Sequence, residues 1–559
     1  MKLVTCFLLS ALALLAQQPQ ANQPPTPPET KPEDLCTIEG QVTNAATGAP
    51  VRKAEINLRG TERATAGTMP ASYTAAADAG GKFTIKDIEP GKYRLSVQHS
   101  GFVNLQYGAR GPNRPGTTLS LGASQRMKDL SLRLAPQAVI TGRIVDDKNE
   151  PVASASVRTM RYSYQMGKRQ LLPTGSAVTN DLGEYRIHSL APGRYYLVAR
   201  ENTDNWEATV DASANPAPEG YVTTYYPGSV DPTTAALIEV GPGVQLRGVN
   251  ITLAKARTFR VRGRVEGRHD ANVSFYPRGQ ARWLSIDGRD HTTDQKGNFE
   301  IDDVLPGTYT LSATVWADQK TLSARQEVDV GEDNVDNIIF VLGSGSELSG
   351  RVAVESGSAP SLDSVGVLLR PQEQTGIMYG SLSGQVHDGA FTISDVASDI
   401  YHLQVMGLPD GYWVKSIRMG DQDVKTAGID LTRGPGDPLT VILAPNAGQI
   451  DGAVMNERQQ AAAGSTVVLV PEPKLREYQD AFKTTVSDQN GRFSLKNLEP
   501  GDYKLFAWED VEYGAYMDPD FLRPWEDRGQ SISVQEGSHE SVQLNVIPAD
   551  SAPGAQKDK

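Results

Sequence analysis

The sequence predicts an all-β protein made of five tandem antiparallel β-sandwich domains. An aromatic residue recurs five times, each time ten residues ahead of a tyrosine, in the pairs Phe83/Tyr93, Tyr185/Tyr195, Phe299/Tyr309, Phe391/Tyr401 and Phe493/Tyr503. Short runs that alternate apolar and polar residues surround these pairs, and no long stretch has helical spacing. A repeat of this length can bury a core of its own, so we expect five serial domains.

The elements of each copy follow in the same order. A strand opens on Gly-x-Val/Ile at Gly40, Gly142, Gly263, Gly350 and Gly452. A turn rich in Asp and Gly precedes the first aromatic, as at Asp78, Asp294 and Asp488, where the carboxylate can cap its own turn. In four copies a Pro-Gly turn then leads into a Tyr-x-Leu strand. The repeated tyrosines are expected to bury their rings and to donate hydroxyl hydrogen bonds to nearby backbone.

The predicted domains end where the strands stop. Their limits are 37–135, 138–254, 258–342, 346–444 and 448–547. The connections are very short, so neighbouring domains should touch, and we expect the five to form a semi-rigid rod.

The segments outside the domains predict export. Lys2 and the apolar run over 3–16 are typical of a signal peptide, residues 1–16, cleaved near Ala16. A Pro-rich linker over 17–36 follows, and a disordered tail is expected over 548–559. No second hydrophobic segment follows, so we expect no membrane span, and a periplasmic, extracellular or envelope-associated protein.

Net charge and cysteine content limit the classes of binding partner that we expect. The formal net charge is −13, which argues against nucleic acid and anionic membrane surfaces. Cys36 is the one cysteine left after signal removal, so no internal disulfide can form, and we expect a monomer.

Catalytic motifs are missing from the sequence. None of the seven histidines has a glutamate three residues later, and neither a Gly-x-Ser-x-Gly elbow nor a phosphate-binding glycine loop occurs. We therefore predict a protein that is not an enzyme, with no catalytic residues, metal or cofactor. The turn aspartates could bind calcium, but each turn offers a single Asp, which favours turn capping.

The motif Asp-x-x-Gly-x-Phe followed by Pro-Gly-x-Tyr-x-Leu, after an opening Gly-x-Val, resembles the carboxypeptidase regulatory-like domain family over residues 37–547. It is also similar to adhesin B-type repeats and starch-binding-like sandwiches. The resemblance implies a transthyretin-like (prealbumin-like), Ig-like sandwich, and adhesin repeats of this kind can carry a Lys–Asn/Asp isopeptide crosslink. Copy four departs from the pattern, because Ser398-Asp399-Ile400 replaces the Pro-Gly turn.

The segments that differ between copies carry the candidate ligand-binding residues. The segment from Trp508 to Gly529 has aromatic rings among seven acidic residues, and copies two and four have aromatic insertions at the same place. The candidates are Trp508, Tyr513, Tyr516, Trp525, Trp206, Tyr225, Tyr226 and Trp413. Such rings can stack on sugars or anchor a partner protein. Alternatively, they pack onto their own sandwich or seal the joints between domains.

These observations predict an exported, non-catalytic protein that binds or scaffolds at the cell envelope. A polysaccharide is the preferred partner and an envelope protein the second. The alternatives are a structural spacer or protein adaptor, and an accessory subunit of a separate hydrolase.

Overall fold

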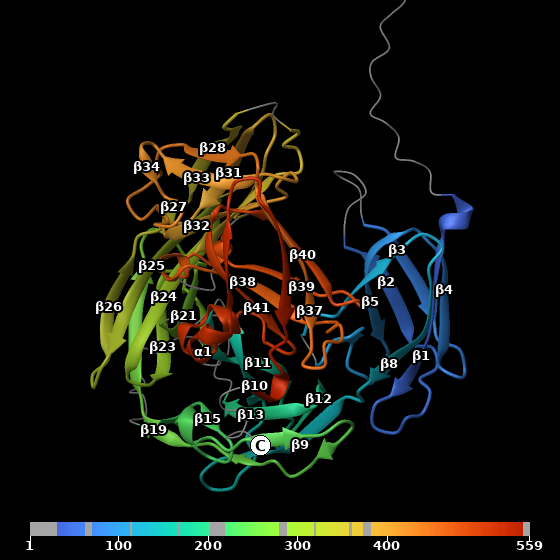
Figure 1. The fold of residues 1–559 in the computed structure, drawn as a ribbon. Coiled ribbons are helices and arrows are strands. Elements are labelled where there is room, and N and C mark those ends of the chain that lie inside the picture. The colour runs from blue at the N-terminus through green and yellow to red at the C-terminus, as the bar shows by residue number, and fades with distance from the viewer. Residues whose placement is uncertain are drawn as a thin grey trace, which may run out of the picture.

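The computed structural model describes residues 31–551, apart from 62–69, 112–113, 166, 202–218, 279–284, 286–287, 318–319, 357–359 and 373–381. The predicted signal peptide, most of the linker, most of the tail and Trp206 lie outside this range. The regular secondary structure of the described chain is almost all β-strand, as predicted (Figure 1). Its strands fall into five consecutive groups of paired sheets, which we number domains one to five.

Domain one shows the plan of each group. One sheet has the order β4-β1-β8, and the facing sheet has the order β3-β2-β5-β6 with β7 also on β5. Buried residues from both sheets form a single core between them. The elements are η1 (Pro32–Asp34), β1 (Cys36–Asn44), β2 (Glu55–Gly60), β3 (Ser72–Ala76), β4 (Lys82–Ile88), β5 (Gly91–Gln98), β6 (Leu105–Gln106), β7 (Thr118–Leu121) and β8 (Arg126–Leu134).

Domain two pairs a sheet of order β12-β9-β17, with β18 also on β9, against β11-β10-β13-β15, with β16 also on β13; a separate ribbon pairs β14 with β19. Its elements are β9 (Ala138–Val145), β10 (Ser156–Gln165), β11 (Lys168–Val178), β12 (Glu184–Leu190), β13 (Gly193–Arg200), β14 (Glu219–Tyr221), β15 (Thr224–Tyr225), η2 (Pro232–Thr234), β16 (Ile238–Val240), β17 (Gln245–Leu246), β18 (Ile251–Thr252) and β19 (Lys255–Arg257).

Domain three pairs β23-β20-β26 against β22-β21-β24-β25-β27. Its strands are β20 (Phe259–Val265), β21 (Asn272–Pro277), β22 (Arg289–Thr292), β23 (Asn298–Val304), β24 (Gly307–Ala317), β25 (Lys320–Val330), β26 (Val335–Phe340) and β27 (Gly343–Ser344).

Domain four pairs β31-β28-β36-β33-β34 against β30-β29-β32-β35. Its strands are β28 (Ser346–Val354), β29 (Gly366–Pro371), β30 (Ser383–Gln385), β31 (Ala390–Val396), β32 (Ile400–Met406), β33 (Trp413–Met419), β34 (Gln422–Asp423), β35 (Ile429–Asp430) and β36 (Leu439–Ala444).

Domain five pairs β40-β37-β43 against β39-β38-β41-β42 and adds short helical turns. Its elements are β37 (Gly448–Met455), β38 (Thr466–Pro471), η3 (Pro473–Leu475), η4 (Gln479–Ala481), β39 (Lys483–Val486), β40 (Arg492–Leu498), β41 (Gly501–Trp508), η5 (Ala515–Met517), α1 (Pro519–Leu522), η6 (Arg523–Arg528), β42 (Gln530–Val534), β43 (His539–Asn545) and η7 (Ala549–Ser551). No helix in the described part of the chain is long and apolar enough to span a membrane.

The repeated aromatic–tyrosine pairs link the two sheets of each domain. Phe83 lies on β4 of one sheet and Tyr93 on β5 of the other, and both rings are buried. Each repeated tyrosine donates its hydroxyl to the backbone carbonyl four residues earlier, as predicted. The acceptors are the carbonyl oxygens of Glu89, Ala191, Leu305, Ala397 and Glu499. The motif is therefore a corner that fixes the crossing from one sheet to the next.

The opening glycine makes room for the repeated aromatic ring. A Cβ atom on Gly40 would lie 2.7 Å from Cζ of Phe83, and the same close approach recurs between Gly452 and Phe493. The opening glycine and the first repeated aromatic, which lie far apart in sequence, are thus in contact in the core.

The turn aspartates cap their own turns. Oδ1 of Asp78 accepts hydrogen bonds of 2.8 Å from the backbone N–H groups of Gly80 and Lys82. Asp294 and Asp488 accept the equivalent pairs of bonds. These oxygens therefore act as caps.

The sandwiches are not wholly antiparallel. In domains one, three, four and five the sheet that holds the opening strand also holds a later strand that runs parallel to it, in the pairs β1/β8, β20/β26, β28/β36 and β37/β43. In domain two, β17 and β18 both run parallel to β9. The chain crosses to the facing sheet before the parallel strand and returns in the direction of the opening strand. Alternation of side chains cannot reveal strand direction, which is why the sequence did not predict this pairing.

The expected semi-rigid rod is wrong, because domain five folds back onto domains one and two. Arg114 Nε of domain one lies 2.7 Å from Asp510 Oδ1, and the Gln489 side chain makes two hydrogen bonds to the backbone of Ser120. The Ser163 hydroxyl of domain two donates to Glu512. Figure 1 shows domain five (red) at the centre of the view, beside domain one (blue, right) and above domain two (teal to green). The five domains therefore form a closed arrangement.

Domain five also contacts domain four through partly buried charges. Lys425 Nζ lies 2.7 Å from both carboxylate oxygens of Glu499, and Gln404 donates to Asp480. Burial raises the pKa of Asp480 and lowers the pKa of Lys483. The joint between these two domains is thus ordered by ion pairs and hydrogen bonds.

Candidate functional site

The aromatic segment of domain five folds into a second core on the outer face of its sheet. Trp508 at the end of β41, Tyr516 in η5 and Trp525 in η6 are 2%, 1% and 3% exposed. Trp508 stacks on Phe506 with 4.9 Å between ring centroids. Asp518 caps α1 by accepting from the N–H of Asp520, which closes the segment over these rings.

This packing leaves the three buried rings no free face for stacking on a sugar. Tyr513 differs, since its side chain is 68% exposed and its ring contacts Tyr516 edge-on. Trp508, Tyr516 and Trp525 therefore pack onto their own sandwich, which was the alternative to ligand binding. Tyr513 is the one predicted residue of this segment that remains accessible.

The other predicted residues lie in separate places. Trp413 on β33 is 8% exposed, with Lys425 Nζ 5.8 Å from its ring centroid. In domain two, Tyr226 packs on the main core, and Tyr225 packs beside Met160. The structure therefore does not bring the eight predicted residues into one site, and Trp206 lies outside the described residues.

The acidic residues between these rings bind other domains of the same chain. Arg110 of domain one pairs with Glu509, and Arg114 pairs with Asp510 and reaches to 3.9 Å from Glu512. Sequence reasoning missed these arginines because it treated each domain alone. The positive charge of the Arg110–Arg114 loop and the negative charge of the Glu509–Glu512 loop were the sequence signal that could have indicated this contact.

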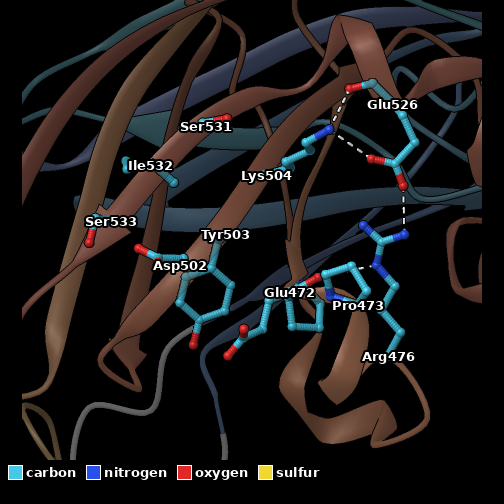
Figure 2. A pocket seen from close by; sticks show the side chains of 11 residues that line it. Glu472, Pro473, Arg476, Asp502, Tyr503, Lys504, Glu526, Ser531, Ile532 and Ser533 are labelled. Atoms are coloured by element: carbon cyan, nitrogen blue, oxygen red, sulfur yellow. Dashed lines mark hydrogen bonds and ion pairs between the residues drawn. The ribbon is translucent and has the colours of Figure 1, made fainter.

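A pocket of about 490 Å³ opens beside this segment, on the outer face of domain five (Figure 2). Strands β41 and β42 form its floor with Asp502, Tyr503, Lys504 and 531–533, and the residues around η3 form its wall. The lining residues are Pro471, Glu472, Pro473, Arg476, Asp502, Tyr503, Lys504, Glu526, Ser531, Ile532 and Ser533. Its size is typical of a small-molecule site, and sequence reasoning did not single it out.

Both cations of the pocket are paired with one carboxylate. Glu526 accepts from Arg476 Nη1 at 2.6 Å and from Lys504 Nζ at 2.8 Å (Figure 2). Burial alone would raise the pKa of Glu526, but these hydrogen bonds outweigh it, so the pKa lies below its usual value. Lys504 also donates to the Glu526 carbonyl oxygen. The triad therefore fixes η6 against β41.

The remaining polar groups of the pocket are mainly acceptors and hydroxyls. Glu472 and Asp502 contribute carboxylates, and Ser531 and Ser533 contribute hydroxyls, around the apolar surfaces of two prolines and Ile532. Such a lining can hydrogen-bond a neutral ligand that carries hydroxyl groups. No group of three or more His, Cys, Asp or Glu that could hold a metal ion occurs among the described residues.

Comparison with known proteins finds a family match over the first domain. Residues 37–133 match the family model of the carboxypeptidase regulatory-like domain. None of the curated proteins matches the chain.

Several solved structures match the chain at low similarity. The minor pilin GBS52 of Streptococcus agalactiae is 11% identical, with 40% of this chain and 96% of that chain covered and a TM-score of 0.22. The Bacillus anthracis TIE protein is 11% identical, with 93% and 76% covered and a TM-score of 0.15. The major pilin subunit BcpA of Bacillus cereus is 9% identical, with 55% and 99% covered and a TM-score of 0.15. These values carry no argument about function. The family match agrees with the repeated motif, and residues 37–133 are similar to the carboxypeptidase regulatory-like domain.

Proposed function

We propose that the protein is an exported, non-catalytic scaffold of the cell envelope whose domain five binds a neutral carbohydrate in the pocket below Glu526. The observation that carries this proposal is the charge pairing of the pocket. Arg476 and Lys504 are both engaged by Glu526, so they do not offer an unpaired cation to an anionic ligand. Asp502 would repel anions and accept hydrogen bonds from hydroxyl groups, and Glu472, which pairs with Lys474 Nζ at 2.8 Å, adds further acceptor oxygens.

The binding mode differs from the ring stacking expected from the sequence. The faces available to a sugar in the pocket are the aliphatic surfaces of Pro471, Pro473 and Ile532. Carboxylates at the rim then fix orientation, which is the usual division of roles in a small-ligand site.

A glycan array followed by calorimetric titration tests this proposal. We expect the parent protein to retain a neutral oligosaccharide, and Asp502→Asn with Glu472→Gln to weaken binding by about ten-fold, the loss of one or two charge-assisted hydrogen bonds. Asp527→Asn is the matched control, because Asp527 is exposed on the same segment outside the pocket lining. No retention by the parent, or equal loss in the control, would refute it.

A purely structural role is the second candidate, favoured by the burial of the aromatic segment. An adaptor or hydrolase subunit would also hold domain five against domains one and two through Glu509, Asp510 and Glu512. Under this alternative the parent would retain no oligosaccharide, and the pocket variants would keep the parent's domain arrangement.

A further inference from the structure

The last strand of domain three has an open edge. In its sheet, β26 pairs with β20 and with no other strand of the described chain. Figure 1 shows β26 at the left margin of the molecule, away from domain five. An unpaired strand edge is a template for pairing with another strand.

Two exposed residues at the end of this strand are apolar. Ile339 is 48% exposed and Val341, just beyond the strand, is 70% exposed. The last strands of the domains align on the residue that pairs with the opening glycine. This residue is Ile338 in domain three, Leu130 in domain one and Val542 in domain five, and in domain two the pair Ile251/Ile144 sets the same alignment. The exposed residues at the aligned outward positions elsewhere are polar: Ser131, Arg133, Asn250, Thr252, Gln543 and Asn545. At these two aligned positions domain three alone among the four has apolar residues, while Asp336 and Asn337, earlier on β26, are exposed and polar.

Domain four shows what such an edge accepts. Its aligned strand β36 carries Ile442 at one outward position, and there the chain adds β33 antiparallel along the edge, with Ser416 opposite Ile442. Thr440 and Ile442 are half-buried as a result. The same fold, with an apolar outward residue on its last strand, therefore has that edge covered by an antiparallel strand.

We propose that the edge of β26 binds β26 of a second copy of this chain, antiparallel, about a two-fold axis. A register centred on Phe340 places Ile339 opposite Val341 of the other copy, so that apolar side chains meet in both halves of the pair. The charges favour this direction. Glu332, Asp333 and Asp336 lie at the start of the strand, and antiparallel pairing keeps the two acidic groups at opposite ends. Parallel pairing would place them side by side.

Such pairing is self-complementary and closes as a dimer, so it does not propagate into fibres. It replaces the monomer expected from the sequence and does not depend on the carbohydrate proposal.

Sedimentation velocity over a range of protein concentrations tests the dimer. We expect the parent to dimerise reversibly, and Ile339→Lys with Val341→Lys to raise the dimer Kd by about ten-fold or more, since lysine on an edge blocks pairing. Ser131→Lys with Gln543→Lys places the same charges at aligned positions of domains one and five, and should leave the Kd unchanged. A parent that stays monomeric at all concentrations refutes the proposal, as does a dimer that both variants retain.

Hydrogen exchange on the parent provides a second readout that needs no variant. Amides of β26 should exchange more slowly at high protein concentration, whereas those of β8 and β43 should not change. Exchange of β26 that is independent of concentration would overturn the proposal, and slowing at β8 or β43 alone would place the interface elsewhere.

Discussion

Reversing the charge of Arg114 should open the closed arrangement of domains. Arg114 is 24% exposed and lies 2.7 Å from Asp510, whose side chain is 32% exposed, and 3.9 Å from Glu512. Exposed ion pairs are worth about 0.2–1 kcal/mol, and partial burial puts the closer pair near the upper end. Arg114→Glu replaces this attraction by a repulsion of similar size, so closure should weaken by about 2 kcal/mol, or roughly 30-fold.

Small-angle scattering measures this change through the radius of gyration. The parent should be compact at about 0.1 M salt and expand towards about 1 M, where the Debye length falls from about 10 to about 3 Å. Arg114→Glu should be expanded already at the lower salt concentration. Arg126→Glu, an exposed change on β8 of the same domain, is the control and should match the parent. The reasoning fails if Arg114→Glu and the parent have the same radius of gyration at low salt.

Two further predictions concern domain five. Trp508→Ala should lower the free energy of unfolding of domain five by about 3–5 kcal/mol, which is the cost of truncating a large buried aromatic side chain. Tyr513→Ala, at an exposed position, should change it by less than about 0.5 kcal/mol. Equal melting temperatures of the two variants would contradict the buried position of Trp508. Because the folded pKa of Glu526 lies below its unfolded value of about 4.3, its pairs with Arg476 and Lys504 stabilise the fold at neutral pH, and this contribution is lost as the pH falls through the folded pKa. Denaturant titrations at pH 7 and about pH 3 should therefore show a smaller loss of stability for Glu526→Gln than for the parent, and an equal loss would refute the assignment.

The repeat motif predicted the local architecture because its residues act within one domain. Asp78 caps its own turn, and Tyr93 donates to a carbonyl four residues earlier, so both contacts are local in sequence. The contact of Gly40 with Phe83 is longer, but it recurs in the other copies and so belongs to the same pattern.

The domain arrangement and the site could not be predicted in the same way. Arg114 and Asp510 are 396 residues apart, and no repetition marks them as partners. Aromatic content likewise does not distinguish the buried Trp508 from the exposed Tyr513, since burial depends on how η5 and η6 pack over β41. The direction of β26 along β20 is also invisible to side-chain alternation.

The contact between domains one and five also implies a minimum delay between the synthesis of domain one and closure of the arrangement. Arg114 emerges 396 residues before Asp510. At roughly 5–20 residues per second, this separation corresponds to roughly 20–80 s of translation, during which domain one can fold but its cationic loop has no acidic partner. Closure is therefore the last folding event, and a chain that stops before domain five would stay open at Arg110 and Arg114 even with its other domains complete.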